Sequence, residues 1–224
     1  MAYKKKSLYI VSNPHINIYY CNKILEDITS TAVYYYENIV KYYNGVLFNK
    51  TSIPVLDMAF LYPVLKNAGS FKRKDLIITT ESGDNKYDII RMVAHELAHF
   101  WCSGADCYSW EDWLNETTAE WAALLYALKS GNTALFDSII NPHLENVNKY
   151  PPIKTSDGTR ALGVHTKGTV LFLEIYKLFG IQVMEDLIKL FAILEIKTTD
   201  YYLEKIKLSI GADVFFYISE NLGS

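Results

Sequence analysis

Strand-forming residues are confined to the first 80 residues of this chain, and this asymmetry limits the available folds more than any other feature. Branched and aromatic residues gather in four short runs, which we predict to be strands: 8–11, 15–20, 52–60 and 75–80. A helix from Asn22 to Tyr43, ended by Asn44-Gly45, is predicted between the second and third runs. After the turn at Ser82-Gly83-Asp84 the pattern is helical to the end. This order predicts an α+β fold in which a small mixed sheet precedes a helical part.

Two helices follow the predicted sheet, and both have clear end signals. Asp84 is a favourable N-cap for a helix from Asn85 to about Cys102, with Gly104 just beyond it as the stop residue. The next helix opens with the capping-box pattern Ser109-Trp110-Glu111-Asp112 and runs to Lys129. A polar loop then leads into a strongly apolar helix from about His165 to Phe179, and two or three further helices finish the chain.

The composition is that of a folded globular protein and disfavours a polyanionic partner. Half of the 224 residues are hydrophobic, and 22 basic residues against 25 acidic ones give a net charge of -3. Nucleic-acid-binding domains usually carry a basic stripe, so no nucleic-acid partner is expected. Because no repeat or long linker divides the chain, we predict one domain over 1–224, with an α+β subdomain at about 1–104 and an all-α subdomain at 105–224.

Cysteine usage and the N-terminal pattern predict a cytoplasmic location. Cys21, Cys102 and Cys107 cannot all pair, and an odd count in a chain of this size favours reduced thiols. The apolar run after the three lysines at 4–6 has only four residues, which is too short for a signal peptide. No stretch approaches the ~20 apolar residues that a membrane span requires. We therefore expect a soluble protein with no membrane partner.

The segment His95-Glu96-Leu97-Ala98-His99 is the strongest chemical signal in the sequence. Two histidines four residues apart on a helix share a face, so both imidazoles can reach one zinc ion. Glu96, one residue on, can then act on a metal-bound water without coordinating the metal. An ordinary amphipathic helix with two buried histidines is the competing interpretation. The position of the segment on a well-capped helix after a sheet favours a zinc site with one ion per chain.

A catalytic zinc site requires a third protein ligand, and two candidates lie on the next helix: Glu116 and Glu120. Here the sequence resembles the thermolysin-like gluzincins, and most closely the catalytic domain of the zinc aminopeptidase family that includes leukotriene hydrolase. His95 to His99 with Trp101 match that family's HELAHxW segment, and Trp113-Leu114-Asn115-Glu116 match its WLNE segment. The resemblance implies a thermolysin-like zincin domain and makes Glu116 the third zinc ligand.

The spacing between the two metal segments departs from the family pattern. Sixteen residues separate His99 from Glu116, two fewer than the family usually has, whereas 20 separate His99 from Glu120. We choose Glu116 because Trp-Leu-Asn precedes it and because loops tolerate short deletions. Glu120 lies one helical turn later, where thermolysin-like enzymes carry an acid that hydrogen-bonds the first histidine ligand. A solvated helix charge is the competing interpretation of Glu120.

His165-Thr166-Lys167-Gly168 resembles the family segment Tyr-Glu-Lys-Gly, which precedes an apolar helix. In the family the tyrosine donates a hydrogen bond to the oxyanion of the tetrahedral intermediate. The resemblance implies the same role for His165, since an imidazole N–H can also donate to an oxyanion. The alternative is that His165 only begins a helix. His15 and His143 lie outside any motif, and Cys102 is either a core cysteine or an alternative metal ligand.

The region before the first metal segment departs further from the family. Aminopeptidases of the family carry Gly-x-Met-Glu-Asn, whose glutamate binds the free amino end of the substrate. This chain has Gly69, Ser70 and Phe71 followed by Lys72-Arg73-Lys74, without Met-Glu-Asn. We expect Gly69, Ser70 and Phe71 to form a sheet edge to which an extended substrate adds as a strand. The three basic residues either favour acidic substrate groups or form a solvated turn.

These residues together predict a zinc-dependent metallopeptidase that acts on a peptide or small protein. Zinc held by His95, His99 and Glu116 would activate a water, Glu96 would take its proton, and His165 would stabilise the oxyanion. Two alternatives stay open: a zinc hydrolase of a non-peptide substrate, and a zinc-binding interaction domain without turnover. The presence of Glu96 weighs against the second alternative.

Overall fold

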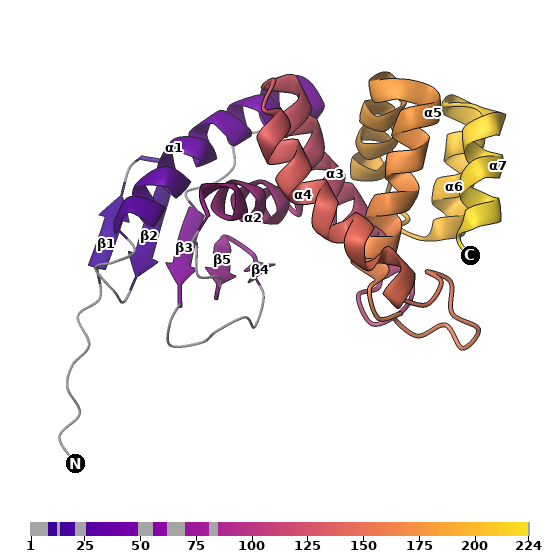
Figure 1. The fold of residues 1–224 in the computed structure, drawn as a ribbon, viewed down its shortest axis with the longest axis horizontal. Coiled ribbons are helices and arrows are strands. Elements are labelled where there is room, and N and C mark those ends of the chain that lie inside the picture. Colours follow the sequence, from indigo (N-terminus) through magenta and orange to yellow (C-terminus); the bar gives the residue numbers. More distant parts are fainter. Residues whose placement is uncertain are drawn as a thin grey trace, which may run out of the picture. The chain divides into compact units, whose positions relative to one another are not determined.

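A computed structural model describes residues 9–12, 14–20, 26–48, 56–61, 70–80 and 85–223. The chain divides into two compact units, Met1–Leu97 and Ala98–Ser224, each of which is described here by itself (Figure 1). The first unit carries the sheet, and the second consists of helices and their connecting loops. The α+β class is therefore confirmed. The single-domain organisation stays a prediction.

The first unit contains a five-stranded mixed sheet with the strand order β1-β2-β3-β5-β4. The two inner pairings, β2 with β3 and β3 with β5, are parallel, whereas β1 and β4 pair antiparallel at the two edges. The strands are β1 (Tyr9–Ser12), β2 (Ile16–Tyr20), β3 (Leu56–Phe60), β4 (Ser70–Arg73) and β5 (Leu76–Thr79). Each predicted run contains a strand, but the boundaries differ by one or more residues. Residues 52–55 of the third run lie outside the described residues.

Alternate residues of the central strands point into the core of the first unit. In β2 and β3 every second residue is buried, and Ile18 and Met58, which pair across the two strands, are fully enclosed. This period of two is the pattern expected of a strand with one buried face. In the sequence, α1 (Glu26–Tyr42) connects β2 to β3. Its residues Ala32, Tyr36 and Ile39 are buried at helical spacing.

The α-helix α1 ends at Tyr42, one residue before the predicted end at Tyr43, but Asn44-Gly45 does not stop helical structure. The chain continues from α1 into a π-helical turn, η2 (Tyr43–Leu47), which passes through both residues. Tyr43 is fully buried and donates a hydrogen bond of 2.9 Å from its hydroxyl to the carbonyl oxygen of Ala94. Glycine inside a helix costs about 1 kcal/mol relative to alanine, which burial of an aromatic ring readily exceeds. Tertiary packing therefore overrides the local stop signal.

The helix that carries the first metal segment is α2 (Lys86–Ala98). Its predicted N-cap, Asp84, lies outside the described residues, and the Asn85 side chain accepts a 3.0 Å hydrogen bond from the Tyr87 amide. The predicted extension to Cys102 is wrong, because the helix ends at Ala98 in a tight turn. The amides of Trp101 and Cys102 both bond to the Ala98 carbonyl oxygen, at 2.9 and 2.8 Å.

The second unit is built around a central buried helix, α3 (Asp112–Lys129). All its residues from Asp112 to Ala127 are buried except Glu116. A helix that is enclosed on all sides lies in the core of its unit. A surface helix would instead bury one apolar stripe and expose its opposite face. The other elements are α4 (Thr133–Asn146), the short 3₁₀ turn η3 (Val147–Lys149), α5 (Val164–Ile193), α6 (Thr199–Ser209) and α7 (Ala212–Asn221).

Two predicted helix ends in the second unit differ from the structure. The capping box at Ser109 does not close, since α3 begins at Asp112 and its N-cap residue makes no side-chain cap bond. Asp112 is instead engaged by Arg160 and Asn115, so it does not reach back to Ser109. The predicted end of the apolar helix at Phe179 corresponds to a break at Gly180, where φ is 83° and ψ is 179°, but helical structure resumes to Ile193.

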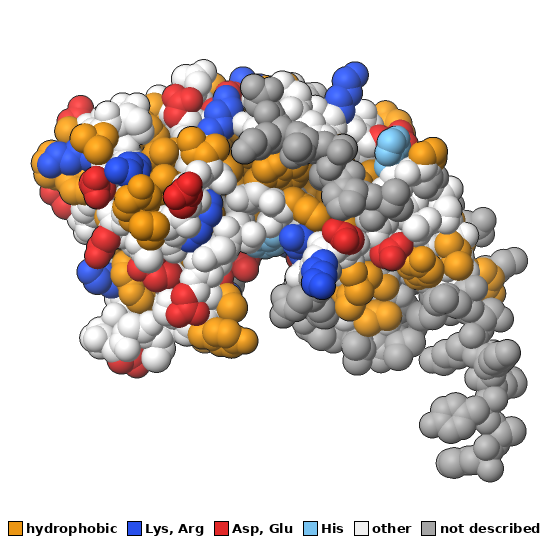
Figure 2. Space-filling view, turned by 180° about the vertical axis from the view of Figure 1, so that it is seen from behind, with side chains coloured by type: hydrophobic (Ala, Val, Ile, Leu, Met, Phe, Trp, Pro, Cys, Tyr) orange, Lys and Arg blue, Asp and Glu red, His pale blue; other side chains and the backbone are white. Residues whose placement is uncertain are grey.

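The surface mixes charge and apolar groups. On the face shown in Figure 2, acidic and basic side chains of the described residues are interspersed among apolar ones. In the described part of the chain, no helix has the combination of length and apolar character needed to span a bilayer.

Candidate functional site

His95 and Glu96 lie near the C-terminal end of α2, in the first unit. The residues around them on this helix, including Val93, Ala94 and Leu97, are almost fully buried, so the helix is fixed in the core. The bond from the Tyr43 hydroxyl to the Ala94 carbonyl lies directly beside the motif. His95 itself is 8% exposed and Glu96 is 4% exposed. A solvated helix position is therefore excluded for both side chains.

His99 follows α2 in the turn that starts the second unit. Its Nδ1 lies 3.0 Å from the carbonyl oxygen of Cys102. A carbonyl can only accept, so Nδ1 carries the proton and donates it. The lone pair is therefore on Nε2, as in a histidine that ligates metal through Nε2 while its other nitrogen is held by the backbone. The donor chemistry of His99 thus fits a zinc ligand.

Cys102 behaves as a core residue. Its side chain is fully buried, and burial raises the pKa of its thiol to about 12. Thiolate is the metal-binding form of cysteine, so a thiol held protonated in the core is a poor ligand. The interpretation of Cys102 as a core cysteine is the one that the structure supports.

The WLNE segment on α3 fixes the second unit around the candidate site. Trp113 donates from Nε1 to the Thr199 hydroxyl at 2.7 Å and packs edge-on against Phe172 at 6.0 Å between ring centroids. Asn115 clamps the loop that joins the two metal segments: its Oδ1 accepts from the Ala105 amide, and its Nδ2 donates to the Ala105 carbonyl, both at 3.0 Å. The segment therefore sets the position of the helix and of the preceding loop.

A buried carboxylate extends this clamp to a second loop. Asp112 accepts a 2.9 Å bond from Asn115 and a 2.6 Å bond from Arg160 Nε. Arg160 belongs to the loop before α5, so both loops that flank the start of α3 are tied to the same turn of helix. These hydrogen bonds hold the loop between His99 and Glu116, which is two residues shorter than in the family pattern, in one conformation.

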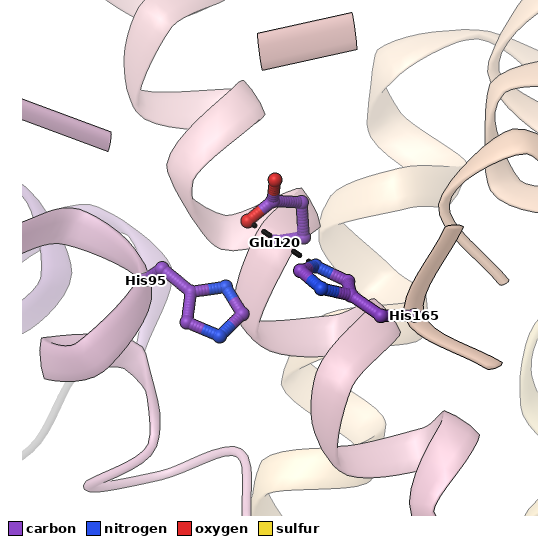
Figure 3. Close-up of side chains that lie close together, drawn as sticks. All are labelled: His95, Glu120 and His165. Atoms are coloured by element: carbon purple, nitrogen blue, oxygen red, sulfur yellow. Dashed lines mark ion pairs between the residues drawn. The ribbon is translucent and has the colours of Figure 1, made fainter. Parts of the chain in front are cut away.

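Glu116, Glu120 and His165, which were predicted separately, come together in the second unit. His165 lies in the first turn of α5, with Nδ1 3.9 Å from Glu116 Oε2 and Nε2 3.5 Å from Glu120 Oε2. Figure 3 shows the pair formed by Glu120 and His165. The side chains of Glu116 and His165 are 23% and 25% exposed, whereas that of Glu120 is fully buried. The solvated-charge interpretation of Glu120 is therefore wrong.

Gly168 allows α5 to approach α3 closely enough for these contacts. A Cβ at this position would lie 1.8 Å from the Thr117 hydroxyl oxygen, which is closer than real atoms come. Gly168 is one turn after His165, and Thr117 follows Glu116. Trp121 adds a 2.9 Å bond from Nε1 to the Thr169 carbonyl oxygen. The absence of a side chain at 168 thus lets the helices meet where His165 faces the two glutamates.

The structure adds one residue that the sequence motifs did not indicate, His143 on α4. Its Nε2 lies 2.9 Å from Glu120 Oε1, and its Nδ1 lies 3.2 Å from the Thr166 hydroxyl. His143 is 23 residues from each of these partners in sequence, so no local spacing signals the contact. Only the packing of α4 against α3 brings it to the site.

The predicted substrate-binding segment is described in part. Gly69 lies outside the described residues, Ser70 begins β4, and the backbone of Phe71 pairs with Ile78 of β5. β4 is an edge strand, as the strand-addition hypothesis requires. Partial burial lowers the pKa of Lys72, whereas Lys74 is exposed in the turn after β4 with φ at 47°. The basic run is therefore part strand and part turn.

Comparison with solved structures relates this fold to zinc peptidases. Leukotriene A4 hydrolase from Saccharomyces cerevisiae matches with a TM-score of 0.71 and 14% identity, over 95% of this chain and 37% of that one. An M1 zinc metallopeptidase from Deinococcus radiodurans matches with a TM-score of 0.63 and 14% identity, over 96% of this chain and 51% of that one. A two-domain M1 zinc metallopeptidase mutant bound to L-tryptophan gives 0.66 and 14%, over 97% and 52%.

These matches establish a relationship of fold. This chain spans about half or less of the length of the structures it resembles. No family model matches the sequence, and no curated protein is similar to it in sequence. The fold is thus shared with zinc metallopeptidases.

Proposed function

We propose that this protein is a zinc-dependent metallopeptidase of the HExxH type. The observation that carries the proposal is the gathering of Glu116, Glu120 and His165 around one point of the second unit. These residues were selected from the sequence for separate roles at a zinc site. The similarity of fold to zinc metallopeptidases gives independent support.

In the proposed site His95, His99 and Glu116 would hold one zinc ion per chain. Neutral imidazoles and a carboxylate are the ligands of catalytic zinc sites, and the backbone-held Nδ1 of His99 leaves its Nε2 for the metal. Glu116 is the only residue of α3 between Asp112 and Ala127 that is not buried, which suits a ligand at the edge of the core. When bound, zinc would lower the pKa of a coordinated water and polarise the scissile carbonyl.

The chain supplies the proton transfers and part of the charge stabilisation. Glu96 would accept a proton from the attacking water and deliver it to the leaving amine. The residue is 4% exposed, so a bound reactant and not bulk water would be its partner in proton transfer. His165 would donate a hydrogen bond to the oxyanion, with Glu120 Oε2 beside its ring to orient it. Glu96 then serves as base and acid, and His165 stabilises charge, in hydrolysis of a peptide bond.

The proposed substrate is a peptide or small protein that binds in extended form along β4. Strand addition to a sheet edge uses main-chain hydrogen bonds, and Ser70 and Phe71 lie on this edge strand, preceded by Gly69. The Met-Glu-Asn motif that would select a free amino end is missing. The proposal therefore includes cleavage within a peptide as well as at its amino end. The odd cysteine count supports action in the reducing cytoplasm.

The assignment of the third ligand can be tested by substitution. Glu116→Gln and Glu120→Gln each remove one charge at nearly constant volume, and zinc content after gel filtration measures metal retention. We expect Glu116→Gln to lose zinc and Glu120→Gln to keep it. The opposite result would exchange the roles of the two glutamates.

The activity itself is tested by metal analysis coupled to a random peptide library. Wild type should contain zinc and cleave the library, and Glu96→Ala should keep zinc but lose cleavage. Cleavage positions also report exo or endo preference.

Fold similarity to leukotriene A4 hydrolase supports a non-peptide hydrolase as the second candidate. A parallel lipid screen distinguishes it, and zinc binding with no turnover of either library would indicate an interaction domain.

A further inference from the structure

His143 is a buried histidine that joins three helices of the second unit. Its side chain is 8% exposed, and it lies on α4 between Glu120 of α3 and Thr166 of α5. The ring of His143 is also 5.0 Å from the ring of His165, measured between centroids. A buried polar ring requires hydrogen-bond partners, and both of its nitrogens have one.

The carboxylate of Glu120 determines which nitrogen of the His143 ring carries a proton. An ionised carboxylate only accepts, so the Nε2 that lies 2.9 Å from Glu120 Oε1 carries a proton and donates it. The Thr166 hydroxyl can donate to Nδ1 across 3.2 Å, and a neutral ring with its lone pair on Nδ1 accepts this bond. All three groups are satisfied by a single arrangement.

The two oxygens of Glu120 are divided between two histidines. Oε1 receives the bond from His143, and Oε2 faces His165 Nε2 at 3.5 Å. A carboxylate held at one oxygen can rotate little about its terminal torsion, so the direction of the other oxygen is set as well. The hydrogen bond at the far side of Glu120 therefore sets the direction of the oxygen that faces His165.

We propose that His143 is a positioning residue of the candidate site, which acts through Glu120 on the orientation of His165. The proposal rests on the proposed function for its effect on hydrolysis. The geometric part involves only residues of the second unit and holds without metal. Partners behind catalytic and ligand residues typically change affinity or activity by roughly 10- to 100-fold when removed.

A matched pair of variants separates the hydrogen bond from the bulk of the ring. His143→Gln places an amide donor near the position of Nε2, whereas His143→Leu has similar volume and no donor. Both remove the aromatic ring, so ring-current and packing effects are common to the two. His15→Gln, at an exposed position outside the site, is the control for histidine loss.

The first measurement uses the metal-free protein and records the ring nitrogen resonances of His165 by NMR. We expect them to shift further from wild type in His143→Leu than in His143→Gln. The second measurement is the initial rate on the peptide library with zinc bound. We expect roughly a 10- to 100-fold loss in His143→Leu and recovery to within about 3-fold in His143→Gln.

The outcomes distinguish the positioning role from the proposed function. If His165 resonances and rates are the same in both variants, the donor has no role and the proposal is overturned. If wild type shows no hydrolysis, the proposed function fails, and the NMR comparison alone still decides whether His143 positions His165.

Discussion

In the proposed function His165 acts through one interaction, a hydrogen bond to the oxyanion. Its imidazole is one quarter exposed and lies in the first turn of α5, beside Glu116 and Glu120. A donor that acts on the oxyanion contributes in the transition state and hardly at all in substrate binding.

We therefore expect His165→Ala to lower kcat by roughly 100-fold while changing KM by less than about 3-fold. His165→Tyr is the matched variant, because a phenol can also donate at this position and should recover part of the rate. Steady-state kinetics on a cleaved peptide provide the measurement. A rise in KM without a fall in kcat would remove His165 from the catalytic group.

The cysteines of the second unit provide a second test at the residue scale. Cys102 is buried with its thiol pKa raised by burial to about 12, whereas Cys107 is exposed. Since thiolate is the reactive form, alkylation at pH 8 should label Cys107 quickly and Cys102 only after unfolding. Peptide mapping by mass spectrometry distinguishes the two sites. Equal labelling of both in the native protein would show that the turn after α2 opens readily.

At the scale of elements, the close contact of α3 and α5 depends on one glycine. Because a Cβ at 168 would lie 1.8 Å from Thr117 Oγ1, Gly168→Ala must push the helices apart or displace Thr117. We expect a loss of about 1 to 3 kcal/mol in the free energy of unfolding. Thr117→Ala in the same chain should recover part of this loss, which a double-mutant cycle from urea denaturation measures. Additive effects would contradict the proposed contact.

A buried carboxylate also links these two helices farther along. Burial raises the pKa of Glu185, but hydrogen bonds from Lys129 and Lys189 outweigh it and lower the pKa below its ordinary value of 4.5. A carboxylate whose pKa is lower in the folded state than in the unfolded state stabilises the protein at pH values above the unfolded-state pKa. This stabilisation is lost as the pH falls through the folded-state pKa.

We expect Glu185→Gln to reduce the free energy of unfolding by about 1 to 2 kcal/mol at pH 7 and by much less at pH 3. Glu174→Gln, which breaks an exposed pair with Lys177, is the control and should change stability by less than about 0.5 kcal/mol. Denaturation curves at both pH values measure the effect. A difference that persists unchanged at pH 3 would exclude the carboxylate charge as its source.

The elements also show which local signals suffice for prediction. Runs of branched and aromatic residues identified the regions of β2 and β3, and the predicted helix after Asp84 placed the first motif on or next to α2. Local signals for helix ends failed where a residue distant in sequence interacts with the same side chain or backbone segment. Arg160 takes Asp112 from the capping box, and burial of Tyr43 carries the helix through Gly45. Neither partner is visible in a local window.

At the scale of the whole molecule, the candidate site could be predicted in its motifs but not in its supporting contacts. Glu116, Glu120 and His165 were found by their resemblance to known segments, whereas His143 comes from α4, which carries no motif. Strand order likewise depends on long-range pairing, since β4 and β3 both lie beside β5. Such contacts depend on global packing rather than on residue spacing.

We propose that this chain holds one zinc ion and uses it with Glu96 to hydrolyse peptide bonds. Removal of metal with a chelator, followed by addition of one equivalent of zinc, tests it most directly with library cleavage as the readout. We expect cleavage by wild type to be lost and then restored, while Glu96→Gln binds the same equivalent of zinc and stays inactive. Cleavage that survives chelation, or that Glu96→Gln retains, would contradict it.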